Sequence, residues 1–118
     1  MLIKQIGLLK RKPGMTPAQF RRYYENSHRV IGEKYLAGYA TRYARRFLNP
    51  LTTSAELQEF DVILEIWYPD HASYDRCREH LSTPAVAAEI AADEEQLFDR
   101  SANRFFLVEE HESSLPSV

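Results

Sequence analysis

Hydrophobic and polar residues alternate in four stretches of the chain, which we interpret as β-strands: residues 2–10, 39–48, 60–68 and 103–111. Such alternation places successive side chains on opposite faces of a sheet. In the third stretch the even-numbered positions are all apolar, whereas Asp61, Ile63, Glu65 and Trp67 mix carboxylates with hydrophobic side chains. We expect its apolar face to lie under helices and its mixed face to meet a partly polar cavity. The Ser/Thr-rich stretch 51–59 is predicted to be a loop.

Between the first two strands the apolar residues recur with helical spacing. Thr16 as the N-cap, Pro17 in the first helical position and Gln19 three residues after the cap are typical of a capping box. The helix is expected to run from Pro17 into the thirties, where Gly32 or Gly38 ends it.

Two helices are predicted between the third and fourth strands. Asp70 caps a helix that runs through His80, and Pro84 restarts a helix in the alanine-rich stretch that follows. Asp93 falls on the apolar face of this second helix. Because Gln96 follows three residues later, we interpret Asp93 as the cap of a fresh short helix and not as a buried charge.

The resulting order is strand, helix, strand, strand, helices, strand, which predicts a ferredoxin-like α+β fold: a βαββαβ protomer with a four-stranded antiparallel sheet and helices on one face. We expect one domain over residues 1–112 and a C-terminal tail at 113–118. No predicted element covers the second face of the sheet, so a homodimer that pairs two bare faces is expected. It would enclose cavities lined by Glu65, Trp67 and their neighbours.

The composition excludes several classes of function. With 15 basic and 17 acidic residues and a net charge of −2, the chain has no electrostatic footprint for nucleic acid. Charged residues interrupt every apolar run before it reaches membrane-spanning length, and the first residues lack the apolar core of a signal peptide. The single cysteine, Cys77, cannot form an intrachain disulfide. We expect a soluble cytoplasmic protein with no membrane partner.

Motifs for nucleotide, flavin, serine-hydrolase or zinc-protease chemistry do not occur in the sequence. Cys77 and His80 have the spacing of two ligands on one helical turn, but no recognisable motif supplies a third. We therefore expect neither a cofactor nor a metal. His71 and His111 are interpreted as surface residues.

Five segments, spread over nearly the whole chain, match a known family in the family's order. They are L-L-K-R-K-P-G-M-T-P-A-Q-F, Y-Y-x3-H ending at His28, E-I-W-Y from Glu65, A-D-E-E-Q-L-F-D from Ala92, and V-E-E-H from Val108. Through them the chain resembles the EthD-like members of the dimeric α+β barrel superfamily. The resemblance implies a ferredoxin-like protomer, a homodimer joined through its sheets, and a pocket between sheet and helices in each subunit.

Relatives with this fold include cofactor-free oxygenases of polyketide quinols, muconolactone-type isomerases, and cyclases or dehydratases of aromatic polyketides. In the isomerase and cyclase relatives, a histidine near the end of the first helix and a tyrosine on the second strand lie in the pocket. His28 and Tyr43 occupy comparable positions in this sequence. The resemblance therefore implies that His28 lines a functional pocket.

His28 and Glu65 are the candidate catalytic residues. An imidazole is well matched to move a proton at cellular pH, and Glu65 either orients it or acts as an acid itself. The alternatives are that His28 only caps or bonds locally within its helix and that Glu65 forms an ion pair with Arg45 or Arg42 on the neighbouring strand.

Tyr24, Tyr43, Arg45 and Trp67 are the candidate substrate-binding residues, although an aromatic side chain on a dimer face also serves as interface packing. The leading hypothesis is a cofactor-independent enzyme of the lyase, dehydratase or isomerase type, acting on an aromatic, polyketide-like or unsaturated acid. One alternative is a cofactor-free monooxygenase of phenolic or quinol substrates. Another is a non-catalytic dimeric protein that binds a small molecule.

Overall fold

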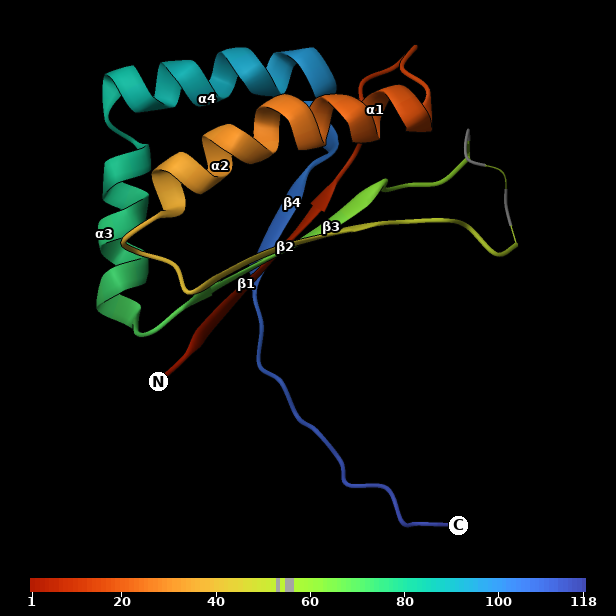
Figure 1. Cartoon of the computed structure of the whole chain (residues 1–118), viewed down its shortest axis with the longest axis vertical. Coiled ribbons are helices and arrows are strands. Elements are labelled where there is room, and N and C mark those ends of the chain that lie inside the picture. Colours follow the sequence, from red (N-terminus) through yellow and green to blue (C-terminus); the bar gives the residue numbers. More distant parts are fainter. Residues whose placement is uncertain (53, 55–56) are drawn as a thin grey trace.

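The computed structural model describes residues 1–52, 54 and 57–118 and places the helices on one side of a four-stranded sheet (Figure 1). In chain order the elements are β1 (Ile3–Leu9), α1 (Pro17–Tyr23), the π-helical turn η1 (Tyr24–His28), α2 (Arg29–Leu36), β2 (Arg42–Phe47), β3 (Val62–Tyr68), α3 (His71–Leu81), α4 (Pro84–Leu97), the 3₁₀ turn η2 (Arg100–Ala102) and β4 (Arg104–Leu107). The strand order is β2-β3-β1-β4, and every neighbouring pair is antiparallel. This topology confirms the predicted ferredoxin-like α+β protomer.

Helix α1 begins where the sequence predicts because a capping box fixes its first turn. The Oγ1 atom of Thr16 accepts a hydrogen bond from the Gln19 backbone N–H at 3.1 Å, and the Gln19 side chain accepts one from the Thr16 N–H at 2.9 Å. The helical path continues through η1 and α2 to Leu36. Gly38 follows with φ +87°, a left-handed conformation that glycine adopts without strain.

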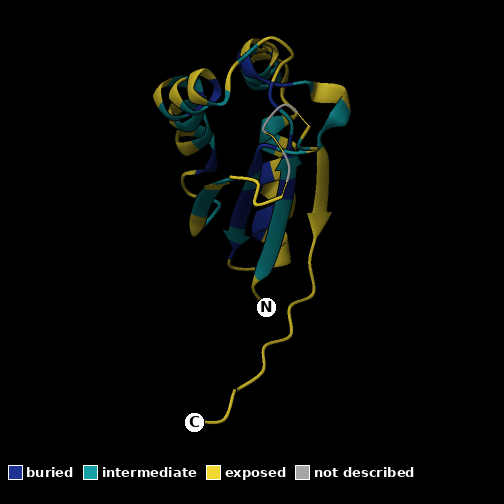
Figure 2. Ribbon diagram, turned by 90° about the vertical axis from the view of Figure 1, so that its right-hand side faces the viewer, coloured by how far each residue is buried: buried dark blue, intermediate teal, exposed yellow. Residues whose placement is uncertain are grey.

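The two faces of the sheet have different surroundings. Alternate residues of β3 lie under the helices, and each is at most 9 % exposed: Val62, Leu64, Ile66 and Tyr68. Their neighbours along the strand, which include Glu65 and Trp67, lie on the face that no helix covers (Figure 1). Figure 2 shows the buried residues concentrated between the helices and the sheet, with β4 and the chain after it exposed.

An aromatic cluster joins the first helix to the sheet and to the end of α4. The centre of the Phe20 ring lies 6.0 Å from the centre of the Tyr24 ring and 5.8 Å from the centre of the Phe98 ring. The Tyr24 ring meets Phe47 of β2 edge to face at 5.6 Å. Tyr24 is fully buried, and Phe20 is 1 % exposed. This packing fixes the helical segment that carries His28 over the sheet.

Helix α4 differs from the sequence expectation, which placed a new helix at Asp93. It runs unbroken from Pro84 to Leu97, and Asp93 is a buried residue only 7 % exposed. The prediction was wrong because it treated a buried carboxylate as unpartnered, whereas Asp93 accepts three side-chain hydrogen bonds from α1 and η1.

The fourth strand is shorter than predicted, since the ladder with β1 pairs only Arg104 to Leu107. The chain after β4 is exposed and extends away from the sheet (Figures 1 and 2). The predicted loop at 51–59 includes positions 53, 55 and 56, which lie outside the described residues. Within the described part of the chain, every helix is too short or too polar to cross a bilayer.

Candidate active site

A cavity of about 190 Å³ lies between the helices and the sheet. Its walls are largely apolar and include Leu9, Leu64, Ile66, Ile90 and Phe98. It is of the order of the cavity of about 150 Å³ that accommodates benzene in a protein core. The space suits one aromatic ring or an unsaturated chain of similar size.

His28 lines this cavity and forms a hydrogen bond to Asp93, which is buried outside the cavity lining. The Nδ1 atom of His28 lies 2.8 Å from Oδ2 of Asp93. The two side chains are 13 % and 7 % exposed, so the pair is screened from bulk water. Because the carboxylate accepts the proton of Nδ1, Nε2 is the unprotonated nitrogen of the neutral ring.

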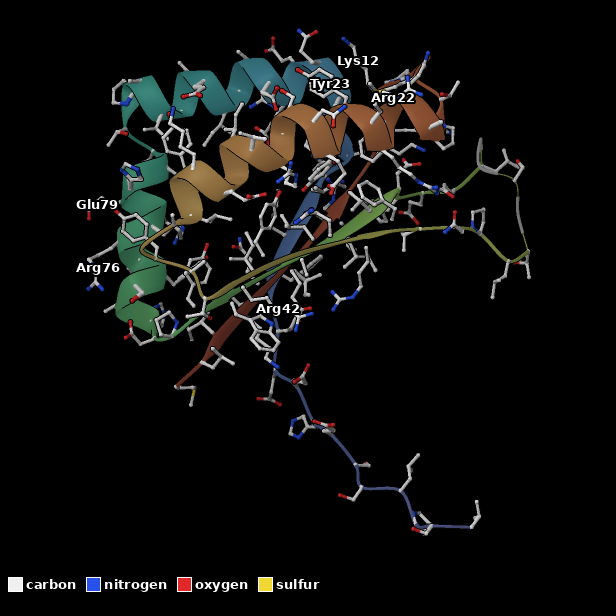
Figure 3. All side chains as sticks on the ribbon, viewed as in Figure 1. Lys12, Arg22, Tyr23, Arg42, Arg76 and Glu79 are labelled. Atoms are coloured by element: carbon white, nitrogen blue, oxygen red, sulfur yellow. The ribbon has the colours of Figure 1, made fainter. Side chains whose placement is uncertain are left out.

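The π-helical turn η1 explains why one helical segment directs three donors at Asp93. Tyr23 donates its hydroxyl at 2.7 Å and Ser27 at 2.8 Å to Oδ1, while His28 bonds Oδ2. In a regular α-helix Tyr23 and His28, five residues apart, would point about 140° away from each other. The turn has an i to i+5 hydrogen bond, from the Arg29 N–H to the Tyr24 carbonyl, which brings residues five apart onto one side. Figure 3 shows Tyr23 beside α4.

These donors keep Asp93 ionised. Burial by itself would raise the pKa of the Asp93 carboxyl, but the hydrogen bonds from Tyr23, Ser27 and His28 together bring it below its usual value. A carboxylate therefore remains next to the imidazole throughout the neutral range, where it orients the ring and stabilises its protonated form.

The His28 ring is also held by two aromatic rings. The centre of the imidazole lies 5.0 Å from the centre of the Tyr24 ring and 5.2 Å from that of the Phe98 ring. The ring planes are nearly perpendicular in both contacts. The rotation of the imidazole is thus restricted on one side by Asp93 and on the others by packing. Such restriction suits a group that must present one nitrogen to a bound molecule.

Tyr43 reaches the cavity from the sheet. Its hydroxyl lies 3.0 Å from that of Tyr24, and its ring packs against Gly32 of α2. A Cβ atom at position 32 would come within 2.9 Å of the Tyr43 ring, so only glycine leaves room for it. Burial raises the pKa of the Tyr43 phenol to about 12, which keeps it a neutral donor at physiological pH.

Glu94, which follows Asp93 on α4, contributes a carboxyl group to the lining of the cavity. Burial raises its pKa above the usual range, and the charges of His28 and Arg100 only partly offset this effect. Adjacent carboxyl groups on one helix thus have pKa values shifted in opposite directions. No motif or spacing in the sequence indicated a role for Glu94.

The structure separates Glu65 and Trp67 from His28. Both lie on the open face of the sheet, where the Trp67 indole N–H donates to Glu65 at 2.9 Å. Arg46 of β2 forms an ion pair with Glu65 at 2.7 Å, and the bond from Trp67 and this ion pair lower the pKa of Glu65. The expectation that Glu65 orients His28 is therefore wrong, because the β-pleat directs the Glu65 side chain to the face opposite the helices, which carry His28. Arg42, which lies over the Trp67 ring, is labelled on this side in Figure 3.

The remaining predicted substrate-binding residues lie on the helix side of the sheet. Arg45 forms a two-pronged ion pair with Glu25, with N–O distances of 2.6 and 3.0 Å, and its guanidinium lies 5.0 Å from the Tyr43 ring centre. Tyr24 is fully buried, and it contacts Tyr43 through its hydroxyl and His28 through its ring. Tyr43 is the residue of this set that lines the cavity directly.

In the described residues, no group of three or more histidine, cysteine or acidic side chains is arranged to hold a metal ion. Cys77 is buried against the Tyr68 hydroxyl, whereas His80 stacks on Tyr39 at 5.5 Å. His71 and His111 are exposed, in agreement with their interpretation as surface residues.

Together, the fold and the cavity define a class: a ferredoxin-like α+β protein with a small apolar pocket between helices and sheet. The model of the EthD domain matches residues 12–101, and the chain belongs to the EthD family. Comparison with curated protein sequences found no match.

Solved structures support the same fold. An ethyl tert-butyl ether D (EthD) family protein from Bacillus halodurans is 20 % identical, with a TM-score of 0.62 over 94 % of this chain and 100 % of that one. A dimeric ferredoxin-like protein of unknown function from Bacteroides fragilis is 11 % identical, with a TM-score of 0.61 over 92 % and 96 %. SnoaB, a cofactor-independent oxygenase from Streptomyces nogalater, is 14 % identical, with a TM-score of 0.56 over 98 % of both chains.

Proposed function

We propose that this protein is an acid–base enzyme that moves protons on an aromatic or unsaturated small molecule, with His28 as the base. The observation that carries the proposal is that His28, which lines an apolar cavity, forms a 2.8 Å hydrogen bond through Nδ1 to the buried carboxylate of Asp93 behind it. Asp93 is the positioning residue, since it acts through the imidazole.

The geometry supports separate roles for His28, Asp93 and Tyr43 in the reaction. Nε2 of His28 accepts a proton from the substrate, and Asp93 stabilises the imidazolium that forms. The phenol of Tyr43 stays protonated and donates a hydrogen bond to an oxygen of the substrate, where negative charge develops. The apolar walls favour a ring or conjugated chain, and they strengthen these electrostatic contacts by excluding water.

Lyase, dehydratase and isomerase reactions need only these proton transfers. Each begins with removal of a proton next to a carbonyl group or an aromatic ring, and side chains alone complete it. We propose a polyketide-like or unsaturated acid as the substrate class, because one flat ring or conjugated segment of it fits the cavity and its oxygens match the Tyr43 donor.

A cofactor-free monooxygenase is the second candidate, and the similarity to SnoaB favours it. In that reaction the same base deprotonates a phenol or quinol, and the resulting anion reacts with dioxygen. Oxygen uptake with 1,4-dihydroxynaphthalene, compared between wild type and His28→Ala, separates the two candidates. Uptake that depends on His28 favours the oxygenase, and uptake at the buffer rate in both proteins favours the lyase or isomerase.

We also propose that two copies pair through their open sheet faces. This face carries Trp67 together with Phe106, which is 50 % exposed and lies opposite Ile6 in the β1–β4 ladder. A sheet face that the described helices leave uncovered and that carries an exposed aromatic side chain favours burial against a partner. The Bacteroides fragilis protein of the same fold is dimeric, which supports the proposal.

The proposed base can be tested with 5-nitro-1,2-benzisoxazole, a flat apolar probe whose ring opens when a base removes its C3 proton. We expect wild-type protein to accelerate the opening and His28→Ala to lower the rate by about 10²-fold, the usual contribution of such a base. His80→Ala is the matched control, because His80 stacks on Tyr39 and does not line the cavity. The coloured phenolate product gives the rate directly.

Two outcomes contradict the proposal. Equal rates for wild type and His28→Ala would show that His28 is not the base. Binding of the probe, followed by quenching of tyrosine fluorescence, without any acceleration would favour a non-catalytic binding protein.

A further inference from the structure

Glu94 lies between the cavity and a second hollow on the protein. It lines the cavity beside His28, and it also lines a neighbouring hollow formed with Arg100, Ser101 and Asn103. Phe105 of β4 is shared by both spaces. Glu94 therefore borders both the cavity that holds His28 and the neighbouring hollow.

The surroundings of Glu94 differ from those of Asp93. Asp93 accepts three hydrogen bonds, whereas no described residue donates a hydrogen bond to the Glu94 carboxyl; its ion-pair partner, the Nε atom of Arg100, is 3.8 Å away. Arg100 is also shared with Glu95, at 3.6 Å. Glu94 thus retains its hydrogen-bonding capacity for a bound molecule.

From this arrangement we infer that Glu94 is a second proton-transfer residue, which gives a proton to the oxygen of the substrate while Nε2 of His28 removes one from carbon. The inference rests on the proposed function, and it deepens it by assigning an acid to the reaction. Two carboxyl groups in different surroundings, one ionised and one able to hold a proton, are a recurrent arrangement in acid–base enzymes.

The electrostatics around Glu94 agree with this role. The charged groups that act on Glu94 are His28 of η1, Asp93 of α4 and Arg100 of η2. Glu95 of α4 shares Arg100, and the phenols of Tyr35, Tyr43 and Tyr68 line the same cavity. Burial raises the pKa of Glu94 in spite of His28 and Arg100. A substrate that displaces water from the cavity raises it further.

The step balances without any further reactant. The proton on carbon goes to His28 Nε2, and the electrons of the C–H bond form a new π bond. The bond between the substrate and its leaving oxygen breaks, and that oxygen takes the proton of Glu94. Once the product leaves, the proton on His28 returns to Glu94 through water. An acid of this kind is needed for elimination or dehydration and not for deprotonation followed by oxygen addition.

Paired benzisoxazole probes test the inference. In 5-nitro-1,2-benzisoxazole the leaving oxygen departs as a stabilised phenolate that needs little help from an acid. In unsubstituted 1,2-benzisoxazole the leaving oxygen is more basic and benefits from a proton. We expect Glu94→Gln to lower the rate on the unsubstituted probe by about 10²-fold, and on the nitro probe by only about twofold.

Glu95→Gln is the matched control, since Glu95 shares Arg100 but points to solvent with a side chain that is 67 % exposed. It should leave both rates unchanged. Equal losses on both probes in Glu94→Gln would overturn the inference, because a purely structural role affects both alike. If His28→Ala leaves the rates intact, the proposed function fails instead, so the two failures are distinguishable.

A direct titration keeps the inference testable without turnover. In carboxyl 13C spectra of wild type, the Glu94 signal is the one that is missing from the spectrum of Glu94→Gln. We expect the pKa of this signal to lie above 4.5, the ordinary value for glutamate. Titration at or below that value overturns the assignment of Glu94 as the acid.

Discussion

Single residues decide the chemistry of this pocket, and Asp93 is the most constrained of them. Its carboxylate is buried and receives hydrogen bonds from Tyr23, Ser27 and His28. Removal of one donor leaves a buried charge with fewer partners, which is more costly than the loss of a neutral hydrogen bond. The donors are therefore expected to stabilise the fold as well as to position the base.

Tyr23→Phe removes one of these donors and keeps the ring. We expect the free energy of unfolding to fall by about 1.5–3 kcal/mol, the range for hydrogen bonds to charged groups. Urea unfolding monitored by circular dichroism measures the change. Tyr39→Phe is the control, since the Tyr39 hydroxyl bonds to no described residue. An equal, small change in both variants would show that the bond to Asp93 contributes little.

Glu94 should lower the free energy of unfolding as the pH rises through its pKa. A salt-bridged carboxylate, whose pKa is lowered, has the opposite effect. Its pKa is raised on folding, so the unfolded chain releases this proton more readily, and ionisation above pH 4.5 destabilises the folded state. Glu94→Gln, which cannot ionise, is expected to gain stability relative to wild type between pH 4.5 and 8. Urea midpoints at the two pH values test this, and a difference that is independent of pH contradicts it.

Sequence reasoning reached some of these residues and not others. The resemblance to known relatives implied that His28 and Tyr43 lie in the pocket, and the structure places both at the cavity. Asp93 was misassigned because a sequence does not show which donors a buried carboxylate will meet. Glu65 was expected to pair with His28, but its partner is Trp67 on the open face of the sheet. The alternation of a strand shows which residues share a face, but it does not show which groups that face will meet.

At the scale of elements, the first helix combines a predictable start with an unpredictable turn. The capping box at Thr16 follows from local residue types, and the structure has it. The π-helical turn at Tyr24–His28 carries no such local signature. It is stabilised by tertiary contacts, the bonds to Asp93 and the aromatic cluster, which a periodicity of 3.6 residues does not reveal.

The contact between α2 and β2 gives a prediction on this scale. In an exposed helix, alanine is more stable than glycine by roughly 1 kcal/mol. At Gly32, however, a Cβ atom would come within 2.9 Å of the Tyr43 ring. We expect Gly32→Ala to lower the free energy of unfolding by about 1–3 kcal/mol, the usual effect of overpacking.

A double mutant tests whether the contact with Tyr43 causes the loss of stability in Gly32→Ala. Gly32→Ala combined with Tyr43→Leu should destabilise by less than the sum of the two single changes, because the smaller side chain relieves the contact. Additive effects measured by urea unfolding would show that the position tolerates alanine and that Tyr43 does not require Gly32.

At the scale of the whole molecule, the helices and the cavity occupy one side of the sheet and an open face remains on the other (Figure 1). The order of the elements predicted this asymmetry, since helix and strand periodicities are local properties of the chain. It also led to the expectation of cavities at the bare face, lined by Glu65 and Trp67. The structure instead has a cavity between the sheet and the helices of a single protomer, where the resemblance to EthD-like proteins implied a pocket.

The proposed dimer is tested by a charge on the open face. Phe106→Asp introduces a carboxylate opposite Ile6 and is expected to convert a dimer into a monomer in sedimentation equilibrium. Val30→Asp, at a residue of α2 that is also 50 % exposed, should leave the dimer intact. If both variants remain dimeric, or if wild type is already monomeric, the open face is not the interface.

The central claim is that Asp93 holds His28 with its proton on Nδ1 and leaves Nε2 as the base in the cavity. Long-range 15N–1H spectra of the imidazole at pH 8, assigned by comparison with His28→Gln, measure which nitrogen carries the proton. The account predicts a protonated Nδ1 and an unprotonated Nε2 in wild type, and loss of this preference in Asp93→Asn. A proton on Nε2 in wild type, or the same tautomer in both proteins, would contradict it.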